Sequence, residues 1–534
     1  MTSTPSNPGA PTVEMVDFSV DGRPVSAPKG TNLLEAMLAA GENLSYFCYH
    51  PGLSVAACCR QCMVAVGTNP KLVPACQMTV QPAMEVYSSR ADVLEARQRM
   101  LEFTLVNHPV DCTICDKAGE CALQRHYMDW DGKDSAINHA KVDKPKKVDL
   151  GPHIVLDTER CILCSRCVRF CQEVAKAPQL VFSRRGDHEM LTTAPGERLD
   201  NPYSLNTVDI CPVGALTDKD FRFKIRVWEL FSTRSTCVGC SAGCQTEIHH
   251  HRNQIYRLVP PKRWDMNLSW MCDDGRRTYK AIGGPRVSQP RVNGRQESLK
   301  DALDAAAASL RPYLGEERHA LGVVVGADLT NEDAFASVHF ARDLLGLAAV
   351  YLADRPNDGR GDGILRRSDP NPNRSGILTI AGDTARSTRD LAADIAAGTV
   401  RALLVVGDSP LSDAGAPEAL RQLAVLVVQA SIASPTSEAA SVLLPAAAWA
   451  EVDGTITNYE GRVQRLRAAV EPPGLARPHW DLIGRLARLL GLEAERPSPE
   501  AVFDELRRHH PSMAHASWGE PMRAGQLRFA GRRG

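Results

Sequence analysis

The sequence predicts a multidomain protein with a cysteine-rich α+β front half and an α/β back half. All 17 cysteines lie between Cys48 and Cys272, and none occurs after Cys272. From about residue 300, short segments rich in Val and Leu alternate with amphipathic helices, a pattern typical of a parallel sheet covered by helices. At roughly 150 residues per domain, a chain of 534 residues should contain several domains.

Composition and charge exclude several classes of protein. The 62 basic and 63 acidic residues give a net charge of −1, which lacks the positive surface typical of nucleic-acid-binding proteins. The longest apolar stretches, such as residues 423–433, are shorter than the roughly 20 residues that a membrane-spanning helix needs. Residues 1–15 have neither the basic nor the apolar part of a secretory signal. We therefore expect a protein that faces the cytosol.

The cysteines occur mainly in C-x2-C groups. In a long chain without an export signal, this spacing suits metal ligation better than disulfide bonds. Thiolates are soft ligands, so zinc, copper and iron–sulfur clusters are the candidates. Four groups follow one another along the chain, and each offers four possible ligands.

The first group follows a predicted strand region at 13–25 and a short helix whose start has a capping pattern in Asn32 and Glu35. Strand, helix and cysteine loop in this order are typical of a β-grasp ferredoxin with a [2Fe–2S] cluster, although the first gap is longer than in plant-type ferredoxins. A zinc site is the alternative. The spacing favours Cys59 over Cys58, which we expect to be a buried small hydrophobe. The predicted ligands are Cys48, Cys59, Cys62 and Cys76.

The second group combines one histidine with three cysteines. It follows a predicted helix at 92–106, which Pro109 ends. A [4Fe–4S] cluster needs four ligands, so the histidine completes the set. Replacing a thiolate by a neutral imidazole makes the site more positive and should raise its reduction potential, as in Rieske centres. The predicted ligands are His108, Cys112, Cys115 and Cys121.

The third group is a C-x2-C-x2-C-x3-C run with one more cysteine further on. In two-cluster bacterial ferredoxins, the fourth cysteine of each run ligates the other cluster and precedes a proline. Here glutamine follows Cys171, whereas proline follows Cys211, and no second run precedes Cys211. The pattern therefore predicts one [4Fe–4S] cluster and leaves Cys171 as a packed free thiol. The predicted ligands are Cys161, Cys164, Cys167 and Cys211.

The fourth group is the least specific, because a C-x2-C pair with a distant partner is also typical of zinc ribbons. A third [4Fe–4S] cluster is the favoured interpretation. The nearby triplet His249–His251 would alternate between the two faces of a strand, so we expect it on a solvated edge. Such a series of clusters would carry single electrons and offers no obvious substrate pocket. The predicted ligands are Cys237, Cys240, Cys244 and Cys272.

Six stretches of the sequence resemble a known family. They are YFCYHPGLSVAACCRQC, HPVDCTICDKAGECALQ, CILCSRCVRFC, CPVGALTDKDFRFKIRVWEL, CVGCSAGC and SWMCDDGR. Over about residues 12–285 the chain is similar to the G subunit of NADH-quinone oxidoreductase (respiratory complex I), the large iron–sulfur subunit of the peripheral arm. The resemblance implies one [2Fe–2S] and three [4Fe–4S] clusters on the four groups, of which the fourth occurs only in some bacterial members, off the main electron route.

Two features depart from that family. The family usually has Gly and a non-cysteine residue where this chain has Ala57 and Cys58. The chain is also short for the family, so we expect a trimmed trailing domain. Arg60, Arg166 and Arg169 stand beside predicted ligands in the sequence, where they could tune the cluster potentials.

The resemblance also implies a function and partners. In this family NADH gives a hydride to flavin on a neighbouring subunit, and single electrons then pass through iron–sulfur clusters toward quinone. We therefore expect a subunit of an H+-translocating NADH:quinone oxidoreductase, without a substrate site of its own, on the cytoplasmic side of the bacterial inner membrane. Its expected partners are the flavin- and NADH-binding subunit, the 2Fe-2S subunit and the quinone-site subunits. We expect contact with the membrane only through those partners, and none with nucleic acid.

The back half is predicted to be a parallel α/β sheet. The stretches LGVVVGADL, RALLVVGDSP and LAVLVVQAS are typical of buried strands, with a helix at 332–345 between them and a long Pro/Gly-rich loop at 354–376. The stretch SEAASVLLPAAAWAEVDGTITNYEGRVQRL resembles molybdopterin-dependent oxidoreductases such as formate dehydrogenase. The residues at that signature's positions are Glu451, Gly454, Thr455, Asn458 and Arg462.

This back half is expected to be a scaffold without a cofactor. No cysteine after Cys272 is available to ligate molybdenum, although Ser or Asp could do so in principle. No G-x-G-x-x-G turn follows a strand, so the sequence offers no site for NADH or flavin. We therefore expect this chain to bind no molybdenum, no flavin and no NADH.

The observations predict a domain order. It is a β-grasp 2Fe-2S ferredoxin-like domain at 12–92, a helical 4Fe-4S module with one histidine and three cysteine ligands at 93–132, a 4Fe-4S ferredoxin-like domain at 133–228, a 4Fe-4S domain of molybdenum-enzyme type at 229–285, a truncated molybdopterin-oxidoreductase-like scaffold at 286–500 and a tail at 501–534. The alternative function is the catalytic subunit of an NAD-dependent formate dehydrogenase, which would need a longer back half. The diaphorase arm of a hydrogenase and a zinc scaffold without redox function come after it.

Overall fold

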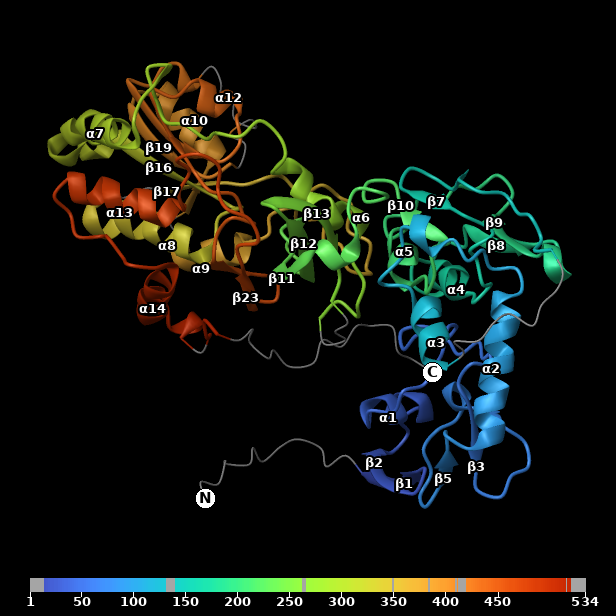
Figure 1. Cartoon of the computed structure of the whole chain (residues 1–534). Helices are drawn as coiled ribbons and strands as arrows, with labels where there is room; N and C mark the ends of the chain where they lie inside the picture. Colours follow the sequence, from blue (N-terminus) through green and yellow to red (C-terminus); the bar gives the residue numbers. More distant parts are fainter. Residues whose placement is uncertain are drawn as a thin grey trace. The chain divides into compact units, whose positions relative to one another are not determined.

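The computed structural model describes residues 14–130, 140–261, 266–347, 350–382, 385–408, 411, 419–514 and 516–519. The chain divides into two compact units, Met1–Glu229 and Leu230–Gly534, and Figure 1 colours them along the sequence. Most of the N-terminal segment that lacks the features of a secretory signal, residues 1–13, and residues 520–534 of the predicted tail lie outside the described residues. In the part of the chain that is described, no helix has the length and apolar character to cross a membrane.

The first unit begins with a five-stranded sheet in the order β2-β1-β5-β3-β4. Its elements are β1 (Met15–Val20), β2 (Arg23–Pro28), α1 (Leu33–Ala39), β3 (Met63–Val66), β4 (Val73–Pro74), the 3-10 turn η1 (Ala75–Gln77) and β5 (Glu85–Tyr87). Strand β1 forms an antiparallel hairpin with β2 and pairs in parallel with β5. The side chain of Asn32 accepts the Leu34 N–H at 3.0 Å and so caps α1. This is the β-grasp arrangement that the sequence predicted.

The rest of the first unit joins short helices to two small sheets. Its elements are α2 (Ala91–Leu105), η2 (Cys112–Ile114), α3 (Ala122–Trp130), β6 (Val148–Asp149), β7 (Ile154–Leu156), α4 (Arg166–Glu173), β8 (Leu180–Ser183), η3 (Gly186–His188), β9 (Met190–Thr193), α5 (Asn206–Ile210), β10 (Leu216–Asp218) and η4 (Val227–Glu229). The strands pair as β10-β7-β6 and as a β8-β9 hairpin. Helix α2 confirms the helix predicted at 92–106.

The second unit begins with a three-stranded antiparallel sheet in the order β11-β12-β13. Its elements are β11 (Phe231–Thr236), β12 (Gln245–His251), β13 (Gln254–Val259), α6 (Asp273–Arg276) and η5 (Thr278–Ala281). The histidines 249–251 lie on β12 and are half-buried. The expectation of a solvated edge strand was wrong, because β12 pairs with β11 on one side and with β13 on the other.

The larger sheet of the second unit has eight strands in the order β15-β14-β21-β20-β19-β16-β17-β18. The strands are β14 (Arg291–Val292), β15 (Arg295–Gln296), β16 (Leu321–Gly326), β17 (Val350–Ala353), β18 (Ala385–Ser387), β19 (Ala402–Val406), β20 (Val425–Ala430) and β21 (Val442–Pro445). Six neighbouring strands of this sheet are parallel, in the spatial order β21-β20-β19-β16-β17-β18. The chain winds outward from β16 through β17 to β18 and then from β19 through β20 to β21. Strand order therefore reverses between β16 and β19, the switch point of a doubly wound sheet.

Helices cover both faces of this sheet, as Figure 1 shows. They are α7 (Leu299–Leu310), α8 (Asn331–His339), α9 (Arg374–Ala381), α10 (Thr388–Ala396), α12 (Pro435–Glu438), α13 (His479–Leu489) and α14 (Pro499–His509), with short turns η6 (Arg311–Leu314), η7 (Glu316–Ala320), η8 (Phe340–Leu344) and η11 (Pro511–Met513) and a hairpin of β22 (Gly454–Thr457) and β23 (Val463–Leu466). Val323 packs in the core with α7 and α8, whereas Val324 packs with α10. Alternate residues of a buried strand thus fill two cores. The parallel α/β sheet and the helix predicted at 332–345 are confirmed.

Candidate iron–sulfur sites

The first site lies between α1 and β3 and includes η1, and it holds all four predicted ligands with Cys58 beside them. Thiol–thiol hydrogen bonds join Cys48 to Cys58, Cys59 and Cys76, and Cys62 to Cys76. These bonds, the one with Cys58 foremost, lower the pKa of the Cys48 thiol. The structure therefore places the four thiols within reach of one another, as a shared cluster requires.

The adjacent residues Cys58 and Cys59 have different surroundings. The backbone N–H groups of Phe47 and Cys48 donate to Cys59 Sγ at 3.4 and 3.5 Å, as they would to a ligating thiolate. The side chain of Cys58 is exposed, and its Sγ lies 3.9 Å from the Cys164 carbonyl oxygen. The expectation that Cys58 is buried was therefore wrong. Ala57 adopts a φ of 49° next to this pair. Both thiols reach Cys48, so the pair differs in exposure and in backbone hydrogen bonds.

The second site lies between α2 and α3. Cys115 is buried and within electrostatic range of Cys112 and Cys121. Nδ1 of His108 is buried and has no hydrogen-bond partner among the described residues. Burial lowers the pKa of His108 to about 4, so its imidazole is neutral at pH 7, the form that ligates metal. A neutral imidazole with an unpartnered buried nitrogen fits a metal ligand.

The third site is a small cavity whose lining includes all four predicted cysteines. Cys161, Cys164, Cys167 and Cys211 surround it together with apolar side chains that include Phe182 and Leu191. Burial raises the pKa of Cys161 to about 12 and that of Cys164 to about 11. Cys171 is buried and does not line this cavity. This position is compatible with the packed free thiol that the sequence predicted, which stays a prediction.

The loops that carry the predicted ligands of the second and third sites contact each other. A Cβ built on Gly214 would lie 2.3 Å from Cys115 Sγ, so only glycine leaves room for that thiol. The Ala122 N–H donates to the Pro212 carbonyl at 2.8 Å, which joins the residue after Cys121 to the residue after Cys211. The loops that carry the ligands of the two sites are therefore held against each other.

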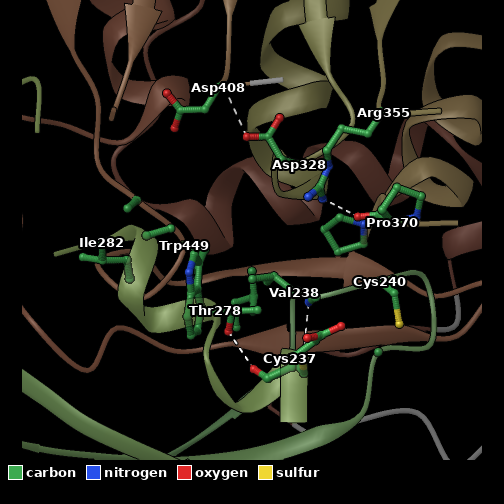
Figure 2. A pocket seen from close by; sticks show the side chains of 18 of the residues that line it. Cys237, Val238, Cys240, Thr278, Ile282, Asp328, Arg355, Pro370, Asp408 and Trp449 are labelled. Carbon is green, nitrogen blue, oxygen red and sulfur yellow. Dashed lines mark hydrogen bonds between the residues drawn. The ribbon is translucent and has the colours of Figure 1, made fainter. Parts of the chain in front are cut away.

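The fourth site lies in the second unit, where Cys237, Cys240, Cys244 and Cys272 line a larger cavity of about 460 Å³. Figure 2 shows Cys237 and Cys240 on one wall of this cavity. The Gly239 N–H donates to Cys237 Sγ at 3.4 Å, and the Gly275 N–H donates to Cys272 Sγ at 3.3 Å. A Cβ on Gly275 would lie 3.0 Å from Cys237 Sγ. Glycines thus leave space for the thiols and donate hydrogen bonds to them.

The loop that carries Cys240 and Cys244 is held by residues that lie more than 200 positions later in the sequence. The Tyr459 N–H donates to the Ser241 carbonyl at 2.9 Å, and Gln464 Nε2 donates to the Gly243 carbonyl at 2.7 Å. The tip and second strand of the β22-β23 hairpin therefore fix the backbone between two predicted ligands.

The wall of this cavity opposite the cysteines is formed by the carboxyl ends of the parallel strands. Asp328 follows β16 and Asp408 follows β19, at the switch point where ligands of doubly wound sheets bind. Figure 2 shows these two carboxylates close together. The Asp408 N–H donates to Asp328 Oδ2 at 3.2 Å, and the Asp408 carboxylate accepts the N–H groups of Ser431 and Ile432. The same cavity is also lined by Arg355, Arg360 and Arg366, so it presents both acidic and basic side chains.

Residues at the positions of the molybdopterin signature make contacts within the protein. Glu451 forms a bidentate ion pair with Arg286 at 2.5 and 2.8 Å. The backbone and hydroxyl of Thr455 both bond to Glu332 at 2.7 Å. None of the five signature residues lines the cavity. Their positions match the signature, but their contacts are with neighbouring protein groups.

Among the described residues, no group of three or more His, Cys, Asp or Glu side chains is arranged to hold a metal ion. A cluster imposes a different requirement from a single ion, because its four protein ligands are shared among several irons, one ligand per iron in a [4Fe–4S] cluster and two per iron in a [2Fe–2S] cluster. Thiols that line a cavity can satisfy a cluster without converging on one point.

Comparisons with known proteins define the class of the chain as a multidomain iron–sulfur protein with a molybdopterin-type domain. Residues 13–91 match a 2Fe-2S iron–sulfur cluster binding domain, residues 97–135 the iron–sulfur binding region of NADH-ubiquinone oxidoreductase-G, residues 151–217 the ferredoxin-like domain of NADH-quinone oxidoreductase subunit 3, and residues 373–489 molybdopterin oxidoreductase. This confirms that the chain contains ferredoxin-like iron–sulfur domains and a molybdopterin-oxidoreductase-like domain.

Curated relatives make the resemblance more specific. The G subunit of NADH-quinone oxidoreductase from Streptomyces coelicolor is 37% identical over 352 residues, which are 64% of this chain and 41% of that protein. The mitochondrial NADH dehydrogenase [ubiquinone] iron-sulfur protein 1 of Solanum tuberosum is 38% identical over 57% of this chain and 42% of its own length. The NADH-ubiquinone oxidoreductase 75 kDa subunit of Reclinomonas americana is 34% identical over 66% and 52%. The resemblance that the cysteine motifs predicted is confirmed, and the chain spans about half the length of these relatives.

Proposed function

We propose that the chain is the iron–sulfur electron-transfer subunit of an H+-translocating NADH:quinone oxidoreductase. The observation that carries this proposal is the contact between neighbouring ligand loops in the first unit. Gly214, three residues after a third-site cysteine, lies against Cys115 of the second site, and Cys58, next to a first-site cysteine, reaches the Cys164 carbonyl. Electron transfer needs redox centres held close together, and these contacts hold three candidate sites in series.

The proposed cofactors are one [2Fe–2S] and three [4Fe–4S] clusters on the sixteen predicted ligands. Such clusters, when bound, accept and donate single electrons, with potentials set by charge, hydrogen bonds and exposure to solvent. The buried cysteines keep water from these sites, and Gly239 and Gly275 donate hydrogen bonds to ligand sulfurs. The domains predicted at 12–92, 93–132, 133–228 and 229–285 would each carry one cluster.

The back half, residues 286–500, is proposed to be a scaffold that binds no molybdenum, flavin or NADH. The contacts of Glu451 with Arg286 and of Thr455 with Glu332, which tie these signature positions to neighbouring protein groups, support this role. The chain would use partner subunits for NADH oxidation and quinone reduction and would lie peripherally on the cytoplasmic side of the membrane.

Iron and molybdenum per chain, measured on anaerobically purified parent complex, test the cofactor assignment. About 14 iron atoms without molybdenum are expected for the four proposed clusters. About 10 would mean that one four-iron site is empty, and the fourth group would be the first to check. Stoichiometric molybdenum would overturn the proposal in favour of a molybdenum enzyme.

A variant of the third site tests the proposed function. Cys164→Ala removes one of four ligands and should abolish electron transfer from NADH to quinone in the assembled complex. Unchanged NADH:quinone activity in that variant would refute the role in electron transfer.

A further inference from the structure

Helix α4 presents two arginines to the loop that carries the first-site ligand Cys48. Arg169 is buried, and its Nη2 donates to the carbonyl oxygens of Cys48 at 2.5 Å and of Cys164 at 3.5 Å. Its Nε donates to Ser165 Oγ at 3.0 Å, and its Nη1 donates to the Ser54 carbonyl. One guanidinium therefore bonds to a ligand residue of the first site and to a ligand residue of the third site.

Arg166, one helical turn earlier, makes a parallel connection. Its Nη2 donates to the Tyr49 carbonyl at 2.5 Å, and its Nη1 donates to the Ile210 carbonyl at 3.1 Å. Tyr49 follows Cys48 and Ile210 precedes Cys211. On the same face of α4, Glu173 accepts the Ser54 N–H at 2.8 Å. We call Arg166 and Arg169 the arginine pair.

The charge of the arginine pair is not neutralised by an ion pair. Within the described residues, neither guanidinium lies within ion-pair distance of a carboxylate, and Nε of Arg166 is buried without a hydrogen-bond partner. Guanidinium stays charged in proteins, and a buried charge is costly unless an opposite charge compensates it. A cluster with four thiolate ligands is anionic, so clusters at the first and third sites would supply that compensation.

We propose that the arginine pair is a shared positioning and electrostatic device that sets the reduction potentials of the first and third sites together. This proposal rests on the proposed function, because it requires clusters at both sites. Reduction adds one negative charge to a cluster, and a fixed positive charge nearby favours that reduced form. Because Arg169 contacts both ligand residues, its removal should lower both potentials, whereas a residue that served only one site would change one.

The test is an EPR-monitored redox titration of the parent complex carrying Arg169→Gln, Arg169→Lys or Arg99→Gln. Arg99 is an exposed residue of α2 that pairs with Glu102 and provides the matched control. In Arg169→Gln we expect the ratio of reduced to oxidised cluster at a fixed ambient potential to fall about tenfold at both sites, equivalent to about 59 mV for one electron. Arg169→Lys keeps the charge and should restore both potentials, but it loses the forked contact and should change the magnetic coupling between the two reduced clusters.

The outcomes separate the two proposals. Wild-type complex without the two cluster signals would overturn the proposed function. Both signals at unchanged potentials in Arg169→Gln, or a shift at only one site, would overturn the shared role and leave the proposed function intact. If Arg169→Gln fails to assemble, Arg166→Gln replaces it, since its contacts are with neighbours of the ligands. It should shift both potentials in the same direction, and unchanged potentials there would also refute the proposal.

Discussion

The contact between Gly214 and Cys115 makes a quantitative prediction for the second site. In Gly214→Ala, the new Cβ would lie 2.3 Å from Cys115 Sγ and 3.3 Å from Lys117 Cβ. Ordinary contact begins at about 3.5 Å, so the thiol must move by roughly 1 Å. The backbone cannot follow easily, because Arg226 Nη1 bonds to the Cys115 carbonyl at 2.7 Å. Metal–ligand distances tolerate only about 0.2 Å, so Cys115 should cease to be a ligand.

The expected result of Gly214→Ala is therefore the loss of one [4Fe–4S] signal and of about four iron atoms per chain, with about 1–3 kcal/mol of destabilisation from overpacking. Iron analysis, EPR and chemical denaturation of the purified complex measure these effects. Gly283→Ala is the control, because a Cβ there would meet only the Lys280 carbonyl oxygen at 3.5 Å. Full iron content with every signal unchanged in Gly214→Ala would refute the assignment of Cys115 as a ligand beside Gly214.

Three further predictions concern other parts of the chain. Cys58→Ser should keep the [2Fe–2S] spectrum and Cys59→Ser should lose or shift it, as visible absorption and EPR would record; the reverse result would make Cys58 the ligand. Burial lowers the pKa of His126 to about 4, below the unfolded value of about 6.5, so its contribution to stability is present above pH 6.5 and is lost as the pH falls toward 4. Urea denaturation should show wild type losing about 2 kcal/mol more than His126→Gln between pH 7 and 5, and equal losses would contradict this. Glu451→Gln should cost about 3 kcal/mol by leaving Arg286 without its ion-pair partner while the iron content stays constant, so a loss of iron would show a role beyond the scaffold.

The sequence predicted features that depend on local chemistry. The ligand spacings, the cap at Asn32 and the missing proline after Cys171 all act over a few residues. The structure confirms the cap, and it places the four cysteines of the third group, but not Cys171, around one cavity. The sequence was less informative where segments distant along the chain determine the surroundings of a side chain. The exposure of Cys58 was not predicted, and one of its contacts is more than a hundred positions away, at the Cys164 carbonyl.

Long-range pairing explains the other differences. The histidines 249–251 were placed on an edge because alternation along one strand does not reveal how many partners that strand has, and β12 has two. Gly214 was present in the stretch CPVGALTDKD, yet its role became apparent only when Cys115 was found against it. The role of Arg169 likewise became apparent only from the structure, because the Cys48 carbonyl that accepts its hydrogen bond lies 121 positions away.

The hairpin that holds the fourth ligand loop has a consequence for the order in which the protein matures. The ligand loops of the first unit are complete once residue 229 has been made, whereas the loop between Cys240 and Cys244 awaits Tyr459 and Gln464. At about 5–20 residues per second, the ribosome needs roughly 10–40 s to travel from Cys272 to Gln464. The fourth site should therefore accept iron last, and a chain interrupted before the hairpin should acquire its other metal centres but not this one. The back half would in this way act as the template on which the last site is folded.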